Sequence, residues 1–316
     1  MLYEFAVEPT CLADWSSFRY LIEQFGVSHG RLISRFPKDW IRSVIEHCGC
    51  GAFTFIQKKR LISEMERIKR HALIRSGRDY ETTLSWQENA LTQHAKSKPF
   101  HAIIVKEASS PENYLLPASD ITQHDERWAI PRERKIPRTV DALSNAVAPL
   151  LGISDHIIFV DRLFRLQGSQ AERWIDTLES FIHRGLNGRT APPSFEYHFQ
   201  IDAYDLGRPK EVREKELQED ANRILQSRLP KGTCMKLVRW TRWHDESDFF
   251  HARYILTDRG GIRIDWGLDL GKSGEKTDIS LLDHKLWQEC WESFQDGAKV
   301  FQLIDSVIVE GRKINP

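Results

Sequence analysis

The 316-residue sequence contains no run of about 18 consecutive apolar residues, so we expect no helix that spans a membrane. Its start, MLYEFAVEPT, has neither the basic nor the apolar segment of a secretion signal. Net charge is also absent, because 45 Lys and Arg balance 45 Asp and Glu. Such a chain has no overall field that attracts nucleic acid or a membrane surface. These absences favour a cytoplasmic globular protein whose affinity for any charged partner is local.

Cysteine is scarce and scattered along the chain. The five cysteines lack the paired spacing of a disulfide framework, which fits a reducing compartment. The segment EHCGC places His47 near Cys48 and Cys50 and could begin a zinc site. No second cysteine pair at ligand spacing follows. We therefore interpret the segment as a helix end with buried thiols, and expect no metal and no cofactor.

Residues 1–135 are predicted to form an N-terminal domain that is mostly helical, of the α+β type. Apolar residues have helical spacing over 14–48, AFTFI (52–56) resembles a short strand, and a helix follows. Eight Lys or Arg lie between 58 and 78, against Glu64 and Glu66. A basic helix face can follow a phosphate backbone, although solvated basic helices are common. The candidate nucleic-acid-binding residues are Lys58, Lys59, Arg60, Arg67, Lys69 and Arg70.

A proline-rich, irregular segment over 97–137 marks the expected domain boundary, and a second domain is predicted over 136–316. A helix is expected over 139–152, despite Pro149. Three apolar strand-like segments then alternate with two helical ones: HIIFVD, SQAERWIDTLESFIHRG, SFEYHFQID, RPKEVREKELQEDANRILQSRLP and TCMKLVRW. This βαβαβ order predicts an α/β fold with a mixed, largely parallel sheet flanked by helices.

The segment FFHARYILTDRGG (249–261) contains the candidate catalytic residues. Strand alternation places His251 and Arg253 on one face, and TDRGG followed by IRIDWGLD predicts a hairpin with Asp258 at its tip. The arginine disfavours the cationic form of the histidine and so keeps the imidazole nucleophilic. A guanidinium can also hold phosphate oxygens. The pattern points to a phosphodiester, and the alternative is a core histidine paired with Asp258 or Asp265.

His251, Arg253 and Asp258 resemble the H-x-K-x4-D signature of the phospholipase D superfamily, with arginine in place of lysine. Over residues 150–315, IIFVDRLFR and TDISLL also resemble the phospholipase-D-like domain at the C-terminus of MIT-domain proteins and its bacterial relatives. The resemblance implies a metal-independent phosphodiesterase or nuclease with His251 as nucleophile, Arg253 on phosphate oxygens and Asp258 in support. It also leaves a non-catalytic alternative, because the MIT-linked domains are thought to bind phosphate-bearing lipids or partners without hydrolysis.

Superfamily enzymes usually combine two such motifs in one site, whereas this sequence has one. The nearest internal echo, at His101, has Ile103 and Ala108 where the arginine and aspartate should stand. A symmetric homodimer could supply the second histidine. We therefore expect a homodimer or an operon partner protein. By analogy with bacterial relatives, antiviral defence is the expected setting.

Residues around the motif are candidates for an anion pocket. Asp161 closes HIIFVD at the carboxyl end of a strand, where α/β sheets commonly bind ligands. In GLDLGKSG, Lys272 and Ser273 could hold phosphate oxygens, although an ordinary hairpin loop is the alternative. Asp269 and Asp278 could orient His251 or Arg253, or simply cap a turn.

The segment VRWTRWHDE (238–246) interleaves arginine with tryptophan, at Arg239, Trp240, Arg242 and Trp243. Such a pattern could stack nucleic-acid bases. The alternative is a strand half-buried by its tryptophans, which has the same sequence pattern. Three functional classes follow from the sequence. They are a phosphodiesterase, a non-catalytic reader of phosphate, nucleic acid or phospholipid head groups, and a scaffold.

Overall fold

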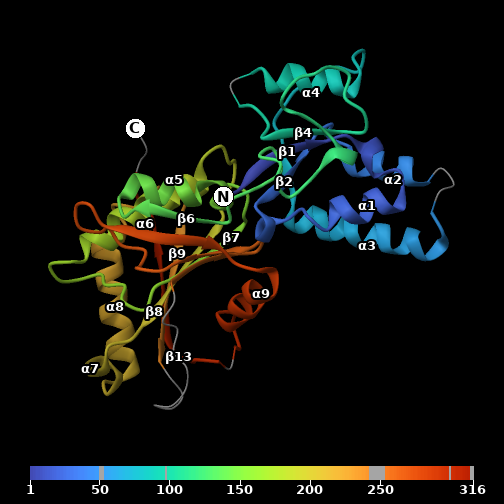
Figure 1. Ribbon diagram of the computed structural model, residues 1–316. Helices are drawn as coiled ribbons and strands as arrows, with labels where there is room; N and C mark the ends of the chain where they lie inside the picture. Colours follow the sequence, from blue (N-terminus) through green and yellow to red (C-terminus); the bar gives the residue numbers. More distant parts are fainter. Residues whose placement is uncertain (50–52, 97, 242–252, 299, 314–316) are drawn as a thin grey trace. The chain divides into compact units, whose positions relative to one another are not determined.

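The computed structural model describes residues 1–49, 53–96, 98–241, 253–298 and 300–313 (Figure 1). Three residues of the sequence predictions, His251, Arg242 and Trp243, lie outside these ranges, as does Cys50. The chain divides into two compact units, Met1–Arg132 and Glu133–Pro316, close to the boundary expected at 135/136. Within the described ranges, no helix combines the length and the apolar character that crossing a bilayer requires.

The N-terminal unit is built on a parallel sheet with strand order β3-β2-β1-β4-β5. The strands are β1 (Tyr3–Val7), β2 (Arg31–Arg35), β3 (Leu73–Arg75), β4 (Ala102–Val105) and β5 (Leu115–Pro117). Most parallel neighbours require a crossover connection, which α1 (Trp15–Ile22), α2 (Trp40–Gly49), α3 (Phe55–His71) and α4 (Trp86–His94) supply. The predicted α/β class is confirmed. The N-terminal unit was predicted to be mostly helical, and the structure adds a five-stranded parallel sheet to it.

Two local predictions in this unit are wrong. β2 lies inside the segment 14–48 that was predicted as helical, because RLISR is a short and largely buried strand between α1 and α2. AFTFI is not a strand in its described part, since α3 begins at Phe55. Thr54 forms a capping box there: its hydroxyl accepts from the Gln57 backbone N, and the Gln57 side chain accepts from the Thr54 backbone N. This cap overrides the strand propensity of the segment.

The C-terminal unit contains an eight-stranded sheet with order β13-β9-β8-β7-β10-β11-β12-β6. At its centre, β7 (His156–Val160), β8 (Ser194–Gln200) and β9 (Cys234–Thr241) are parallel. They are connected by α6 (Glu172–Leu186), and by α7 (Ala203–Leu206) with α8 (Lys210–Leu225). The βαβαβ prediction is therefore confirmed.

The remaining pairings in this sheet are antiparallel. They involve β6 (Glu133–Pro137), β10 (Arg253–Thr257), β11 (Gly261–Ile264), β12 (Lys276–Leu281) and β13 (Gln302–Glu310). The expected hairpin is present as β10–β11. This sheet is mixed but less parallel than predicted. In the β10–β11 hairpin the reason is the turn at 258–260, which is too short to join parallel neighbours.

Helices cover both faces of this sheet (Figure 1). α5 (Val140–Leu151) lies beside α6 on one face, where Phe159 of β7 stacks on Phe181 of α6 with ring centroids 5.6 Å apart. α9 (His284–Ser293) covers the other face, where Trp287 packs with Val160 and Val238. Strand alternation therefore places Phe159 of β7 on the α6 face and Val160 on the α9 face, so both faces of this strand are buried.

Candidate functional site

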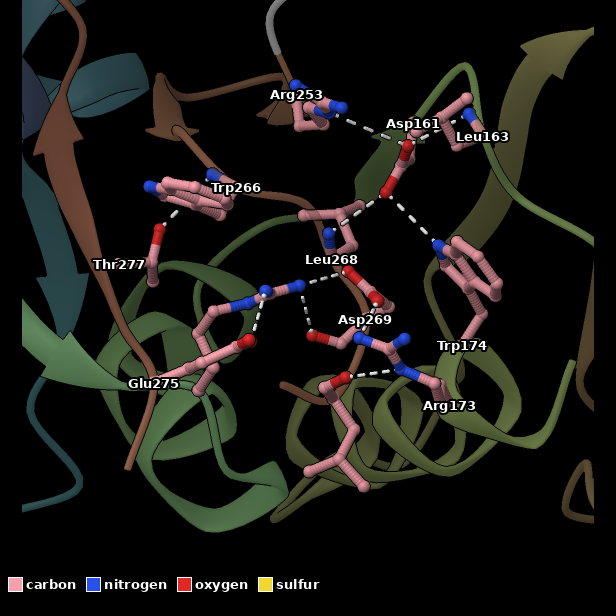
Figure 2. A network of polar contacts seen from close by, with 12 residues as sticks. Asp161, Leu163, Arg173, Trp174, Arg253, Trp266, Leu268, Asp269, Glu275 and Thr277 are labelled. Atoms are coloured by element: carbon pink, nitrogen blue, oxygen red, sulfur yellow. Dashed lines mark hydrogen bonds and ion pairs between the residues drawn. The ribbon is translucent and has the colours of Figure 1, made fainter. Parts of the chain in front are cut away.

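The carboxyl end of β7 holds a network of buried polar contacts (Figure 2). Asp161 directly follows β7 and is 1% exposed. Its Oδ1 accepts from the backbone N of Leu163 at 3.0 Å, and its Oδ2 accepts from the backbone N of Leu268 at 3.0 Å and from Nε1 of Trp174 at 3.2 Å. One carboxylate thus joins the β7–α6 loop, α6 and the loop between β11 and β12.

Arg253 lies beside this carboxylate because β10 runs antiparallel to β7, with Tyr254 opposite Val160. Its Nε is 3.8 Å from Asp161 Oδ1, and its side chain is 18% exposed. Nη1 donates to the backbone O of Asp265 at 3.3 Å, while Nε is buried and donates no hydrogen bond to a described residue, so any donor for a ligand is at the Nη groups. A guanidinium has five N–H donors. As far as the described residues show, Arg253 keeps donors for a ligand oxygen.

A second buried carboxylate, Asp269, pairs with two other arginines (Figure 2). Its Oδ1 is 2.5 Å from Nη2 of Arg138, and its Oδ2 is 2.8 Å from Nη2 of Arg173. Arg138 also reaches Oε2 of Glu275 at 2.9 Å. Burial raises the pKa of Asp269, and the charges of the two arginines oppose that shift. These pairs anchor the loop 265–275 to α6 and to the start of α5.

The loop passes between the two carboxylates at Gly267. Its φ is +127°, and a Cβ there would lie 2.5 Å from Asp269 Oδ1 and 3.3 Å from Asp161 Oδ2. Only glycine adopts this positive φ readily and, having no Cβ, leaves both carboxylates in place.

The phosphate-binding assignments of four residues change with this geometry. Asp161 and Asp269 are carboxylates engaged by N–H donors, so they position backbone and arginines and cannot themselves hold an anion. Lys272 and Ser273 are exposed on a turn in which Glu275 Oε2 accepts from the Lys272 backbone N at 3.0 Å. That carboxylate occupies the Lys272 amide, so the hairpin-loop alternative fits this turn better.

Asp258 does not lie beside Arg253. It sits in the turn at the other end of β10, where its Oδ1 accepts from the backbone N of Asp155 at 3.0 Å and of His156 at 3.2 Å. A strand rises about 3.3 Å per residue, so Asp258 and Arg253 are roughly 16 Å apart along the strand. Its catalytic assignment is corrected to a structural one: Asp258 fastens the start of β7.

The basic face of α3 in the N-terminal unit is largely exposed. Its exposed cations are Lys58, Lys59, Arg60, Lys69 and Arg70. Arg67 differs, because its Nε pairs with Glu64 at 2.7 Å while Nη1 and Nη2 donate to the carbonyls of Phe25 and Ile22 at 3.1 and 2.6 Å. Arg67 secures the chain after α1, and we remove it from the nucleic-acid candidates.

The tryptophan that was predicted to stack bases is buried. Trp240 is 3% exposed, and its Nε1 donates to Nδ1 of His198 at 3.0 Å. Arg239 is also buried and pairs with Asp305 at 2.7 Å. For these two residues the alternative of a strand half-buried by tryptophan is correct. An exposed tryptophan of this unit lies elsewhere, at Trp266.

The segment considered for zinc contains a buried thiol. Sγ of Cys48 donates to the carbonyl of Leu12 at 3.0 Å, and burial raises the pKa of Cys48 to about 11. Among the residues in the ranges given above, no three metal-ligating side chains gather. Cys48 therefore packs as a small apolar residue.

A separate polar cluster lies on the α9 face of the sheet. Glu196 accepts from Nε2 of His156 at 2.8 Å and from Nε2 of His198 at 3.0 Å. Because Trp240 donates to Nδ1 of His198, the ring proton of a neutral His198 is on Nε2. Burial lowers the pKa of His198, although Glu196 opposes the shift. Burial alone would raise the pKa of Glu196, but both histidines and Lys236 bring it well below its usual value.

We expect His198 to make the protein less stable in mild acid. Its folded pKa lies below the ordinary 6.5, so the unfolded state binds more protons below that pH. Stability present above pH 6.5 is then lost as the pH falls toward the folded pKa, and Glu196 adds a further loss below pH 4.5. The measurement is the thermal midpoint of wild type and His198→Gln from about pH 7.5 to pH 5.

The difference between the two proteins isolates His198, because burial also lowers the pKa of His94 and His101 in the other unit. We expect a smaller acid-induced drop for His198→Gln, in which the amide can still accept from Trp240 and donate to Glu196. Equal drops in both proteins would show that His198 is not the acid-sensitive group.

Comparison with known proteins yields no family. No family model and no curated protein matches the chain. Among solved structures, the chain is similar to TrmBL2, an archaeal chromatin protein whose structure is described as showing a novel mode of DNA binding. The TM-score is 0.26 and the identity 12%, over 52% of this chain and 52% of that protein, so about half of each is matched. A likeness at this level bears on neither fold nor function.

Proposed function

We propose that the C-terminal unit recognises a phosphodiester at the carboxyl end of β7, through Arg253. The observation that carries the proposal is a partly exposed guanidinium that, among the described residues, donates one hydrogen bond, through Nη1, next to a buried carboxylate that three N–H groups hold in place. Asp161 orients the arginine and leaves donors to spare. A guanidinium presents N–H groups in the paired arrangement that phosphate oxygens accept.

The resemblance to the phospholipase D superfamily extends this proposal to hydrolysis. His251 would attack phosphorus, forming an N–P bond as the P–O bond to the leaving group breaks. A histidine from the second subunit of a homodimer would protonate the leaving oxygen, and water would then hydrolyse the phosphohistidine. His251 lies outside the described residues, so the proposed hydrolysis is argued from the sequence motif. The proposed phosphodiester binding is argued from the positions of Arg253 and Asp161.

A non-catalytic phosphate-binding module is the second candidate. The separation of Asp258 from Arg253 favours it, because the motif does not converge on one point. For either candidate we propose, from the sequence arguments alone, a cytoplasmic setting and a role in antiviral defence.

Cleavage and binding assays separate the two candidates. Wild type is incubated with labelled single-stranded DNA and RNA, with and without EDTA. We expect cleavage that survives EDTA and is abolished in His251→Ala, which still binds. Arg253→Ala should bind about ten- to one-hundred-fold more weakly, since a hydrogen bond to a charged group contributes about 1.5–3 kcal/mol.

The outcomes divide clearly. Binding without cleavage by wild type selects the non-catalytic module. The proposal of phosphodiester recognition fails if wild type binds neither nucleic acid, or if Arg253→Ala binds as tightly as wild type.

Nucleic acid is the phosphodiester that we propose, with α3 of the N-terminal unit as an electrostatic contact. Replacing Lys58, Lys59 and Arg60 together by glutamine should weaken binding and make it less sensitive to salt. Each lost phosphate contact lowers the slope of log K against log salt by about one. The measurement is affinity across a salt series, with Lys285→Gln, an exposed lysine on α9, as the control. Identical slopes in the triple variant and wild type would exclude α3 from the interface.

A further inference from the structure

Trp266 leaves a large aromatic surface in water beside the proposed site. It is 66% exposed, in the loop between β11 and β12. Figure 2 shows Trp266 bound to Thr277, on the loop whose Leu268 binds Asp161. Exposing an aromatic ring forgoes the stabilisation that burying it would provide. A ring held open at the edge of a candidate site is therefore a candidate contact for a ligand.

The backbone beneath this ring is fixed. Trp266 N donates to Oγ1 of Thr277 at 3.2 Å, and Asp265 N donates to the carbonyl of Asp278 at 3.1 Å. Two residues further on, Leu268 N is held by Asp161. A ring carried on such a backbone needs little ordering when a ligand stacks on it.

Arg253 and Trp266 are neighbours in space. Arg253 pairs with Ile264 across the β10–β11 ladder, two residues before Trp266. Nη1 of Arg253 donates to the carbonyl of Asp265, whose peptide bond leads directly to Trp266. The guanidinium therefore contacts the peptide unit that leads to Trp266, which brings a phosphate donor close to the residue that carries the ring.

Two carboxylates on the strands and turn around Trp266 have cationic partners. Oδ1 of Asp265 is 2.9 Å from Nε of Arg263, and Oδ1 of Asp278 is 3.6 Å from Nζ of Lys135. Neither carboxylate is left as an unpaired repulsive charge toward an approaching nucleotide.

We infer that the ligand is a single-stranded nucleic acid, with one base stacked on Trp266 and an adjacent phosphate at Arg253. This inference rests on the proposed function, which it makes specific. Single-strand-binding proteins combine a cationic path for the backbone with aromatic side chains that stack bases. A duplex keeps its base faces stacked on one another, and a phospholipid head group has no flat ring to place on the indole. The observations therefore favour the single strand.

The test uses three labelled probes: a short oligothymidylate, an abasic oligomer of the same length, and a blunt duplex. Wild type should bind the oligothymidylate more tightly than either of the others. Trp266→Ala should lose about ten-fold in affinity for the oligothymidylate and nothing for the abasic oligomer. Trp266→Phe should recover most of the loss. Tyr204→Ala, at an 81% exposed aromatic on α7, is the matched control and should bind like wild type.

The result separates this inference from the proposed function. If Arg253→Ala weakens both single-stranded probes but Trp266→Ala weakens neither, phosphodiester binding stands and base stacking is wrong. Tighter binding of the duplex by wild type would also overturn the inference. If Arg253→Ala changes neither affinity, the proposed function fails and the inference falls with it.

Discussion

Replacing Asp305 by alanine is expected to lower the free energy of unfolding by about 3–5 kcal/mol, because removing one partner of a buried ion pair leaves an uncompensated charge. Asp305 of β13 is fully buried opposite Arg239 of β9. Its two carboxylate oxygens accept from Nε and Nη2 of Arg239 at 2.7 and 3.0 Å, and Nε of Arg213 lies 3.4 Å from Oδ2. In Asp305→Ala, Arg239 would keep one carboxylate partner, Asp205, whose Oδ2 lies 3.6 Å from Nη1 of Arg239.

Urea unfolding followed by tryptophan fluorescence measures this change. Asp296→Ala is the control, because Asp296 is 90% exposed and pairs with Lys236 at the surface. It should alter stability by less than about 1 kcal/mol, as exposed ion pairs contribute little. A loss in Asp305→Ala no larger than in the control would mean that the two arginines find solvent or other partners when the carboxylate is removed.

Asp161→Asn is expected to destabilise the C-terminal unit by about 2–3 kcal/mol and to weaken phosphodiester binding. Both carboxylate oxygens accept from N–H groups, so the amide nitrogen of asparagine must face a donor in either orientation. An unsatisfied buried donor costs about 1–3 kcal/mol. The substitution also removes the charge that orients Arg253.

Hydrogen exchange at the Leu268 amide reports this change locally, beside urea unfolding for the global effect. We expect faster exchange in Asp161→Asn, since the Leu268 N–H loses its acceptor or shares a weaker one. Asp265→Asn, at an exposed carboxylate paired with Arg263, is the control and should leave exchange at Leu268 unchanged. Wild-type protection of Leu268 in Asp161→Asn would show that the carboxylate does not anchor the loop.

The C-terminal unit is the more predictable part of the fold. Its strand β7 is a continuous apolar segment, β8 and β9 have seven and eight residues, and α6 has a clear apolar stripe, so local pattern and tertiary role agree. β1, β2 and β3 of the other unit are three to five residues long. Strands this short have no measurable period and pair with segments about thirty or more residues away. A predominantly helical pattern therefore conceals the parallel sheet.

The candidate site is predictable only where it is local. Asp161 can be found because it ends an apolar strand, and Arg253 because it belongs to a motif. Arg138 and Arg173, which pair with Asp269, are about 100 or more residues away from it in the sequence. Arg138 also follows directly on a segment whose composition is typical of a linker. No sequence pattern around Trp266 indicates a binding residue. At Trp240 the alternation of arginine and tryptophan suggests base stacking, but alternation in a strand also places tryptophan in the core, where Trp240 lies.

The Nε–Hε resonance of Arg253 in 15N-labelled protein tests phosphodiester recognition most directly. The signal is identified by its absence in Arg253→Lys and followed while oligothymidylate is added. We expect the Hε resonance to move until the ligand saturates, because a phosphate oxygen that accepts from the Nη groups changes the electron distribution of the same guanidinium, whose Nε lies 3.8 Å from Asp161 Oδ1. A resonance that stays in place at saturation would contradict phosphodiester binding at Arg253.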